Sequence, residues 1–256
     1  MTNEELFNAL KPVVREAGAA IMAVYAKGAE ADFKADGSPV TEADQAAEAV
    51  ILAALVRLAP DILVISEENA DSHALAAPPR FLLVDPLDGT KEFLKRDGQG
   101  AFTVNIGLIE QGVPVAGVVY APALDRLFVG VVGVGAQEEC AGAVRSIAVR
   151  RVPSDGPVAV ASVSHRDALT NAWLAKRGIE RTVSVGSSLK FCLLAAGEAD
   201  VYPRFGPTME WDTAAGDAVL RAAGGAVTRP DGEVFGYGKV DYRNAAFVAW
   251  GGMRPD

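Results

Sequence analysis

The start of the chain has apolar residues at helical spacing, and the pattern recurs after a short loop. The first set comprises Leu6, Leu10, Val13, Ala17, Ile21 and Val24. This spacing places one face of a helix against a core, and Thr2 with Glu5 forms a capping-box pattern before it. A second helix is predicted from about Glu42 to Leu58, introduced by Thr41. Residues 35–39, Ala-Asp-Gly-Ser-Pro, have the composition of a loop between the two.

Short apolar runs bounded by turn residues follow the second helix and predict strands. These runs are residues 64–65, 81–84, 102–109, 113–120 and 127–132. The run at 81–84 is expected to be a buried strand that ends before Asp85. Glu110-Gln111-Gly112 is a hairpin signal between two of the runs. Residues 69–79 are polar and contain proline, which predicts a loop.

The rest of the chain mixes short strands with helices, which predicts an α+β fold in two layered halves. Strands are expected at 158–163 and 182–185, and helices at 189–196 and 213–223. Residues 150–157 are polar and contain two prolines, so we expect a subdomain boundary there. The prediction is one domain over residues 1–256, with subdomains of about 1–152 and 153–256.

Composition and charge exclude several classes of protein. The formal net charge of −9 argues against a surface for a nucleic-acid polymer, although a bound metal ion can still attract a small anion. Two cysteines, Cys140 and Cys192, suggest a reducing compartment. The longest apolar run, residues 49–56, is too short to span a bilayer, and no signal peptide is evident. The chain is expected to be cytoplasmic. Peripheral attachment to the inner face of the membrane is left open.

Residues 85–93, Asp-Pro-Leu-Asp-Gly-Thr-Lys-Glu-Phe, carry the strongest chemical signal. Pro86 fixes a backbone angle, and Asp88-Gly89 is a turn dipeptide. Two carboxylates on a stiff turn suit Mg²⁺, which prefers oxygen ligands. If a helix begins after Gly89, its first N–H groups would bind phosphate. The run therefore predicts a metal and a phosphate held side by side.

Other acidic residues lie at suggestive places, and each also has an ordinary structural explanation. Asp44 lies three residues after Thr41 and can complete a capping box. Glu67 follows a strand and can be a solvated loop charge. Asp85 and Asp88 can simply form a turn, and Asp212 can cap a helix. Only Asp85 and Asp88 favour a functional role when taken singly.

Taken together, three blocks resemble the ordered signature of the inositol monophosphatase superfamily. They are Glu67-Glu68, then Asp85-Pro-Leu-Asp88-Gly-Thr90, then Trp211-Asp212-Thr-Ala-Ala-Gly216. Members of this superfamily are metal-dependent, lithium-sensitive phosphatases. The resemblance implies the layered α/β/α/β/α sandwich of the inositol monophosphatase and fructose-1,6-bisphosphatase type.

Further segments resemble one branch of that superfamily, the CysQ-type 3'(2'),5'-bisphosphate nucleotidases. Lys91-Glu92-Phe93 follows the Asp-Gly-Thr as in these nucleotidases, whereas inositol phosphatases continue with a Thr-Asn-Phe type. Residues 117–122, 186–192 and 202–207 show the same likeness, which extends to about residue 224.

The resemblance implies a site with two to three Mg²⁺ ions. Glu67, Asp85 and the Leu87 carbonyl would hold the first ion, and Asp85, Asp88 and Asp212 the second. A weaker third ion would lie near Glu67 and Asp44. The nucleophile would be a water activated either by Thr90 paired with Asp44 or by Glu67, and the sequence does not decide between these.

Substrate-side residues are also carried over from the resemblance. The Gly89 and Thr90 N–H groups, with Asp212, would contact the phosphate that is cleaved. Ser164, His165, Gly186, Ser187, Lys190 and Arg204 match the nucleotide-side segments of the branch. Lys190 and Arg204 are candidates for the phosphate that is not cleaved, because cationic donors recognise phosphate. The ordinary alternatives are a surface histidine and solvated charges; His73 is assigned no role, and Trp211 is expected to pack behind Asp212.

The function that the resemblance implies is removal of the 3'-phosphate from adenosine 3',5'-bisphosphate, giving AMP and phosphate, in sulfate assimilation or nucleotide clearance. An inositol or broad-specificity sugar monophosphatase is the alternative on the same fold. A silent metal-binding or anion-binding protein is a third hypothesis, which the complete set of ligands disfavours. The expected partner is a small phosphorylated substrate, and the chain is expected to be a monomer or homodimer.

Overall fold

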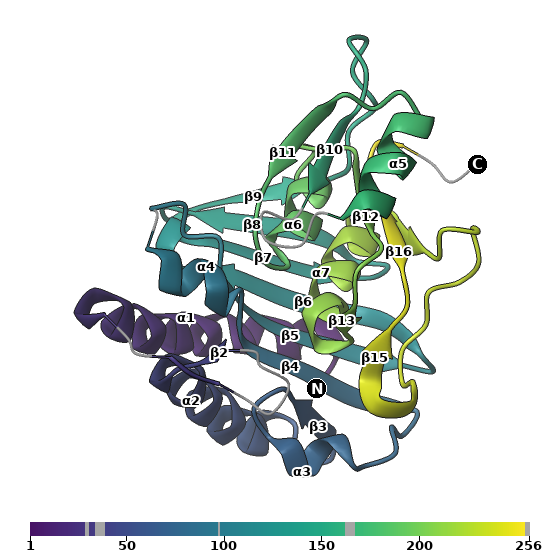
Figure 1. Ribbon diagram of the computed structural model, residues 1–256. Helices are drawn as coiled ribbons and strands as arrows, with labels where there is room; N and C mark the ends of the chain where they lie inside the picture. The colour runs from purple at the N-terminus through teal and green to yellow at the C-terminus, as the bar shows by residue number, and fades with distance from the viewer. Residues whose placement is uncertain (29–30, 34–38, 97, 162–166, 254–256) are drawn as a thin grey trace.

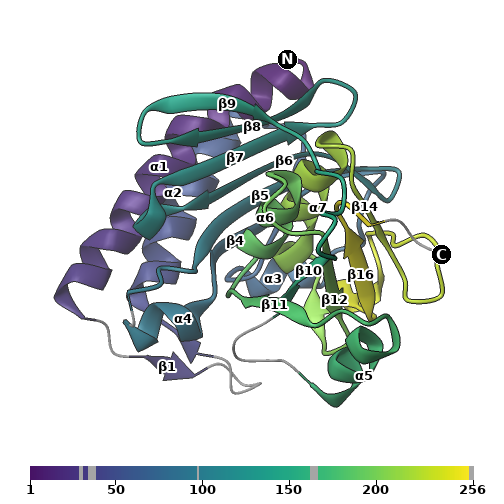
Figure 2. The same cartoon turned by 90° about the horizontal axis from the view of Figure 1, so that it is seen from above.

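Helices and sheets alternate in five layers, which confirms the predicted α/β/α/β/α order. The computed structural model describes residues 1–28, 31–33, 39–96, 98–161 and 167–253. Helices α1 (Asn3–Lys27) and α2 (Glu42–Leu58) cover the outer face of a seven-stranded sheet (Figure 1). Helices α6 (Leu189–Ala195) and α7 (Trp211–Ala222) cover its other face. A five-stranded sheet and α5 (Ala168–Lys176) lie beyond them (Figure 2).

The two large sheets differ in strand direction and in their place along the chain. The seven-stranded sheet has the spatial order β3 (Leu63–Ser66), β4 (Arg80–Asp88), β5 (Thr103–Glu110), β6 (Val113–Ala121), β7 (Arg126–Val131), β8 (Gly135–Cys140), β9 (Ala143–Ile147). It is antiparallel except for the β3–β4 pair. The five-stranded sheet has the order β11 (Arg181–Ser184), β10 (Val158–Ala161), β12 (Val201–Arg204), β16 (Phe247–Trp250), β14 (Ala226–Thr228). The subdomain division near residues 152–153 stays a prediction and falls in the connection between the sheets.

In the part of the chain that the structure describes, three hydrophobic clusters fill the spaces between the layers. One joins α1 and α2 to the outer face of the large sheet through residues such as Leu10, Ile51 and Ile106. A second joins the inner face to α6, α7 and the small sheet, and a third packs α5 on the small sheet through Trp173 and Trp250. Side chains alternate between the two faces along each strand, so one strand contributes to two clusters.

Both predicted helix starts are confirmed as capping boxes. The Thr2 hydroxyl accepts the Glu5 N–H, and the Glu5 carboxylate accepts the Thr2 N–H. Thr41 and Asp44 repeat the arrangement before α2. The hairpin is confirmed as well, because Gln111 and Gly112 both have positive φ angles, 51° and 76°, between β5 and β6.

The strand that carries the acidic motif was predicted too short. β4 runs to Asp88 instead of ending before Asp85. Its register against β5 shifts between Asp85, opposite Asn105, and Asp88, opposite Thr103. The extra residue on β4 forms a bulge, where a proline such as Pro86 is tolerated because a ladder donor is lost there in any case.

Several elements were not predicted from the sequence. The expected loop at 69–79 contains a one-turn helix, α3 (Ala70–His73). Strands β8, β9, β12, β14 and β16 and helix α5 were also missed, as were two small antiparallel pairs. These pairs join β1 (Asp32–Phe33) to β2 (Pro39–Val40), and β13 (Thr208–Met209) to β15 (Arg243–Asn244). The turns η1 (Pro122–Leu124) and η2 (Val240–Tyr242) were missed too. A helix does begin after Gly89, as the phosphate-binding hypothesis required: α4 (Thr90–Lys95).

Candidate active site

A cavity of about 620 Å³ lies where β4, α4, α6, β12 and α7 meet. Most of the predicted functional residues line it: Glu67, Asp85, Leu87, Asp88, Gly89, Thr90, Ser187, Lys190, Arg204 and Asp212. Asp44 and Gly186 lie just outside the lining. Ser164 and His165 fall outside the described residues. The fold therefore brings together segments that are more than 100 residues apart in the chain.

The bulge in β4 turns both carboxylates of the motif toward the cavity. Asp85 is almost fully buried, and its Oδ1 accepts the Leu87 N–H at 3.0 Å. Asp88 Oδ2 accepts the Ser188 N–H at 2.5 Å, which ties the motif to the start of α6. A regular strand would send residues an odd number of positions apart to opposite faces. The extra residue on β4 allows Asp85 and Asp88 to line the same cavity.

Asp212 reaches the motif because α7 packs unusually close to the large sheet. A Cβ atom on Gly117 would lie 2.3 Å from the Ala215 carbonyl oxygen, and one on Gly107 would lie 2.7 Å from the Ala215 nitrogen. Glycine at both positions therefore permits the close approach. Asp212 is in the first turn of α7, and its Oδ2 accepts the Met209 N–H at 2.8 Å.

Glu67, Asp85 and Asp212 form a cluster in which one carboxylate oxygen from each lies within 4.8 Å of the others. We call these three and the neighbouring Asp88 the carboxylate cluster. Burial, with Glu67 and Glu92 nearby, raises the pKa of Asp88 to about 6. Burial and the charges of Asp88 and Glu67 raise the pKa of Asp212 well above its usual value.

Repulsion of this kind is relieved when a cation binds among the carboxylates. All the side-chain atoms that could ligate a metal in the cluster are oxygens. This suits a hard divalent ion such as Mg²⁺ rather than a thiolate-preferring metal. The cluster thus fits the metal that the sequence predicted.

Asp44 combines its structural and its predicted functional roles. Its Oδ2 accepts the Thr41 N–H and hydroxyl, each at 2.8 Å, which completes the capping box of α2. Its Oδ1 lies 3.3 Å from the Thr90 hydroxyl, which also lies 3.2 Å from the Leu87 carbonyl. The cap therefore fixes the carboxylate that faces Thr90, and a single hydroxyl proton can go to only one of the two acceptors at a time.

Gly89 sets the start of α4 beside the cluster. Its φ angle of 91° is in the left-handed region, and a Cβ there would lie 3.0 Å from the Ala101 carbonyl oxygen. α4 begins at Thr90, so its first backbone N–H groups have no acceptor within the helix. These groups are available to an anion at the cavity.

Two buried cations, Lys190 and Arg204, line the cavity with the carboxylate cluster, and we call them the cation pair. Lys190 Nζ donates to the Ser187 carbonyl at 2.5 Å and lies 5.2 Å from the centre of the Tyr202 ring. Burial lowers the pKa of Lys190 to about 8, partly offset by the attraction of Asp88. Arg204 Nε and Nη2 donate to the carbonyls of Gly206 and Pro207 at 3.2 and 3.1 Å. Arg204 thus braces its own loop.

Gly186 and Ser187 shape the connection into α6. A Cβ on Gly186 would lie 2.6 Å from Glu92 Cγ and 2.8 Å from the Ala101 carbonyl, so glycine permits close packing there. Ser187 has a positive φ of 51° and presents its carbonyl to Lys190.

Sequence reasoning missed several residues that support the site. Ser188 donates its N–H to Asp88, and its hydroxyl lies 2.5 Å from Asn105 Oδ1 and 2.9 Å from Thr103 Oγ1. The signal was present, because Ser188 lies inside the 186–192 segment. His73 was assigned no role, yet its Nε2 lies 2.8 Å from the Ser66 carbonyl oxygen, and its ring stacks on Trp211 with centroids 4.7 Å apart. It therefore links the residues that precede Glu67 and Asp212.

Comparison with known proteins gives similarity along nearly the whole chain. A sequence model of the inositol monophosphatase family matches residues 2–252. The 3'(2'),5'-bisphosphate nucleotidase CysQ of Salmonella typhimurium is 51% identical over 228 residues, covering 88% of this chain and 91% of that protein. CysQ of Buchnera aphidicola is 42% identical over 243 residues, covering 93% and 90%.

Solved structures show the same likeness. CysQ from Bacteroides thetaiotaomicron gives a TM-score of 0.80 at 37% identity and covers 97% of each chain. An inositol monophosphatase from Anabaena gives a TM-score of 0.75 at 27% identity, covering 97% of this chain and 91% of that one. The same fold thus occurs in proteins named for each of the two substrate classes.

Proposed function

The chain belongs to the inositol monophosphatase family, and on that basis we propose that it is a Mg²⁺-dependent 3'(2'),5'-bisphosphate nucleotidase. The reaction would convert adenosine 3',5'-bisphosphate and water to AMP and phosphate. The observation that carries the proposal is the pairing in one cavity of an oxygen-only carboxylate cluster with two buried cations. Relatives named as bisphosphate nucleotidases, at 42–51% identity over most of the chain, support the substrate class.

The carboxylate cluster would hold the metal ions. Glu67, Asp85 and the Leu87 carbonyl are proposed for one ion, and Asp85, Asp88 and Asp212 for another, with a weaker third near Glu67 and Asp44. When bound, such ions neutralise phosphate charge and lower the pKa of a coordinated water. The raised pKa of Asp88 and of Asp212 supports this assignment, because burial and neighbouring carboxylates disfavour the charged form more than Lys190 and Arg204 favour it.

The chain's own groups would orient the attacking water and the phosphate. The Thr90 hydroxyl lies within reach of Asp44, so Thr90 can accept a proton from a water while passing its own to Asp44. Glu67 is the alternative base. The first N–H groups of α4, at Gly89 and Thr90, would donate to the phosphate oxygens.

The cation pair would recognise the phosphate that is not cleaved. Lys190 is held close to the carboxylate cluster through Ser187, because the next residue, Ser188, donates to Asp88. A buried ammonium that keeps its charge interacts strongly with a phosphate in a site shielded from water. Gly186 and Ser187 would shape this wall of the cavity, and Ser164 and His165 are proposed for the nucleoside.

Paired phosphate-release assays test the proposal. Purified protein with Mg²⁺ should release phosphate from adenosine 3',5'-bisphosphate with a far higher kcat/KM than from inositol 1-phosphate, and chelation by EDTA should abolish both activities. Release from inositol 1-phosphate alone would replace the proposal with the monophosphatase alternative. Binding of Mg²⁺ in calorimetry without turnover of either ester would support a silent binding protein instead.

The remaining expectations concern location and assembly. No helix in the described ranges is both long enough and apolar enough to cross a membrane. A cytoplasmic location, peripheral membrane attachment and a monomeric or dimeric state stay predictions.

A further inference from the structure

Besides Lys91, Lys190 and Arg204, a fourth cation lines the cavity and was not assigned any role by the sequence. Arg243 is exposed, lies on β15 and lines the cavity at the side of Thr208 and Met209. Its side chain makes no hydrogen bond and no ion pair with any residue in the described ranges. Arg243 therefore differs from the surface arginines that are paired with acids, such as Arg229 and Arg181.

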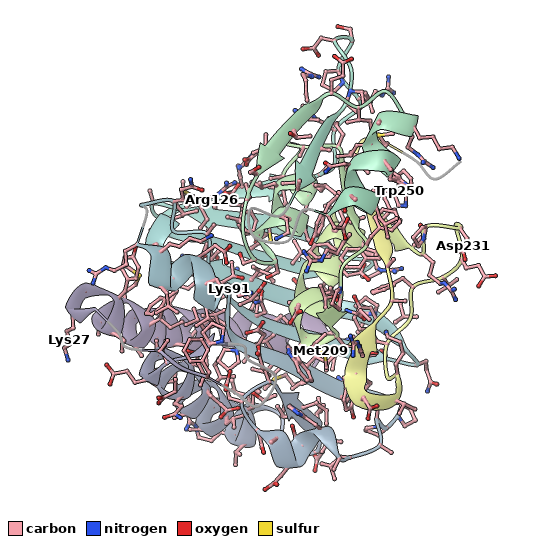
Figure 3. All side chains as sticks on the ribbon, viewed as in Figure 1. Lys27, Lys91, Arg126, Met209, Asp231 and Trp250 are labelled. Atoms are coloured by element: carbon pink, nitrogen blue, oxygen red, sulfur yellow. The ribbon has the colours of Figure 1, made fainter. Side chains whose placement is uncertain are left out.

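The backbone of Arg243 is held firmly next to the carboxylate cluster. β13 and β15 pair so that Arg243 lies opposite Met209, whose N–H donates to Asp212 at 2.8 Å. Cα atoms of opposite residues in an antiparallel pair are about 5 Å apart. Figure 1 shows β15 running beside β13 at the start of α7, and Met209 is labelled in Figure 3.

The residues around Arg243 restrain it further. Asn244 Nδ2 donates to the Met209 carbonyl at 2.7 Å, and the Tyr242 hydroxyl donates to the Leu75 carbonyl at 2.6 Å. The buried Glu210 accepts the N–H groups of Gly238 and Lys239 at 2.8 and 2.9 Å, which fixes the loop that leads to β15. A rigid backbone that carries an unengaged cation is preorganised for a ligand, because little ordering remains to be done on binding.

The cation pair has fewer donors left for a ligand. Arg204 directs two of its N–H groups to carbonyls of its own loop, and Lys190 gives one to Ser187. Among the described residues, none accepts a hydrogen bond from Arg243, whose guanidinium donors have the planar arrangement that matches phosphate oxygens. It therefore offers a more complete phosphate-binding surface than either member of the cation pair.

We infer that Arg243 binds the phosphate of the substrate that is not cleaved and thereby favours bisphosphorylated nucleotides over monophosphorylated ones. This inference rests on the proposed function. The cleaved phosphate would lie at the carboxylate cluster, where bound metal ions would supply the positive charge. The second phosphate would depend on side-chain cations for charge neutralisation.

Steady-state kinetics of Arg243→Gln test the inference on two substrates, adenosine 3',5'-bisphosphate and adenosine 3'-monophosphate. We expect KM for the bisphosphate to rise about 10- to 100-fold with little change in kcat, as for the loss of one charge-assisted contact. Activity on the monophosphate should stay within about 2-fold, because that substrate lacks the second phosphate. Arg243→Lys should recover part of the loss, since it keeps the charge but not the planar fork.

Arg229→Gln is the matched control for net charge, because Arg229 is paired with Asp231 and Glu233 on a remote turn, marked by Asp231 in Figure 3. It should leave both KM values unchanged. Equal losses on both substrates in Arg243→Gln, or no loss on either, would overturn the role of Arg243 while leaving the nucleotidase assignment intact. A wild-type protein that cannot hydrolyse the bisphosphate would instead remove the proposed function together with the inference.

Discussion

The carboxylate cluster and the cation pair line the same cavity but are built in opposite ways. The carboxylates stand at the ends of elements, on a bulged strand and in the first turn of α7, and like charges lie close to one another. The cations lie in α6 and β12, and each is held by carbonyls of the protein. On the carboxylate side, Lys190 and Arg204 only partly offset the negative charge, so the pKa values of Asp88 and Asp212 stay raised, whereas the cations are partly satisfied before any ligand arrives.

This difference separates a site for a cation from a site for an anion that is bound and released. Carboxylates that repel one another favour strong binding of a divalent ion, because the ion removes their mutual repulsion. Partly satisfied cations bind a phosphate without holding it as tightly as bare charges would. Substitutions in the carboxylate cluster should therefore lower kcat, whereas substitutions in the cation pair should raise KM.

The largest effect is expected from Asp88→Asn. Loss of one metal-ligand carboxylate should lower kcat by on the order of 10³-fold, because charge stabilisation by a metal is worth several kcal/mol. Without metal, the Asp88→Asn variant should be more stable than the wild type at neutral pH. The folded pKa of about 6 exceeds the ordinary value, so ionisation of Asp88 costs stability as the pH rises through this range.

Phosphate-release assays with saturating Mg²⁺ and thermal unfolding in EDTA measure these two effects. The stabilisation in EDTA should fade below about pH 4, where Asp88 is protonated in the folded and unfolded states alike. Near-native kcat in this variant would contradict the metal assignment, and a lower Tm in EDTA would contradict the repulsion argument.

The carboxylate side was more predictable from the sequence than the cation side. Asp85, Asp88 and Thr90 lie within six residues of the chain, and turn chemistry alone pointed to Asp85 and Asp88. The bulge that directs Asp85 and Asp88 into one cavity was not predicted, because a register shift depends on the partner strand β5. The same limit explains why β4 was predicted to end too early.

Arg243 shows where sequence reasoning reached its limit. Its position beside Asp212 depends on pairing two-residue strands that are separated by more than 30 residues. Neither strand has an alternating pattern long enough to detect. His73 was missed for a related reason, because its ring stacks on Trp211 only after the large sheet and α7 have packed.

An intermediate effect is expected from Thr90→Val, which removes the hydroxyl while keeping the shape. If Thr90 and Asp44 relay a proton, kcat should fall about 10²-fold, the lower range for a general acid–base group. Asp44→Asn should cause a similar fall, and the double variant should be no worse, because two members of one relay are not additive. Thr90→Ser should retain activity as the matched control.

Multiplicative losses in that cycle would indicate separate roles for Thr90 and Asp44 and would favour Glu67 as the base. Asp44→Asn should also cost about 1 kcal/mol of stability through the capping box of α2. Thermal unfolding of each variant separates this structural loss from the catalytic one.

The smallest effect is expected from Lys190→Met, and it should fall on KM. The thioether side chain packs on Tyr202 as the lysine stem does, but it cannot neutralise a phosphate. We expect KM for adenosine 3',5'-bisphosphate to rise about 10-fold with kcat nearly unchanged. Arg57→Met, an exposed site on α2, is the control for loss of one positive charge.

Stability should change in the opposite direction to affinity in Lys190→Met. Burial lowers the folded pKa of Lys190 to about 8 from an ordinary value of 10.5, so its charge disfavours the folded state at neutral pH. The variant should gain about 1–2 kcal/mol at pH 7, after allowance for the lost bond to Ser187. The gain should shrink as the pH rises from 8 to above 10, where lysine is neutral in both states. A lower Tm at pH 7, or an unchanged KM, would show that Lys190 is held for packing and not for the substrate.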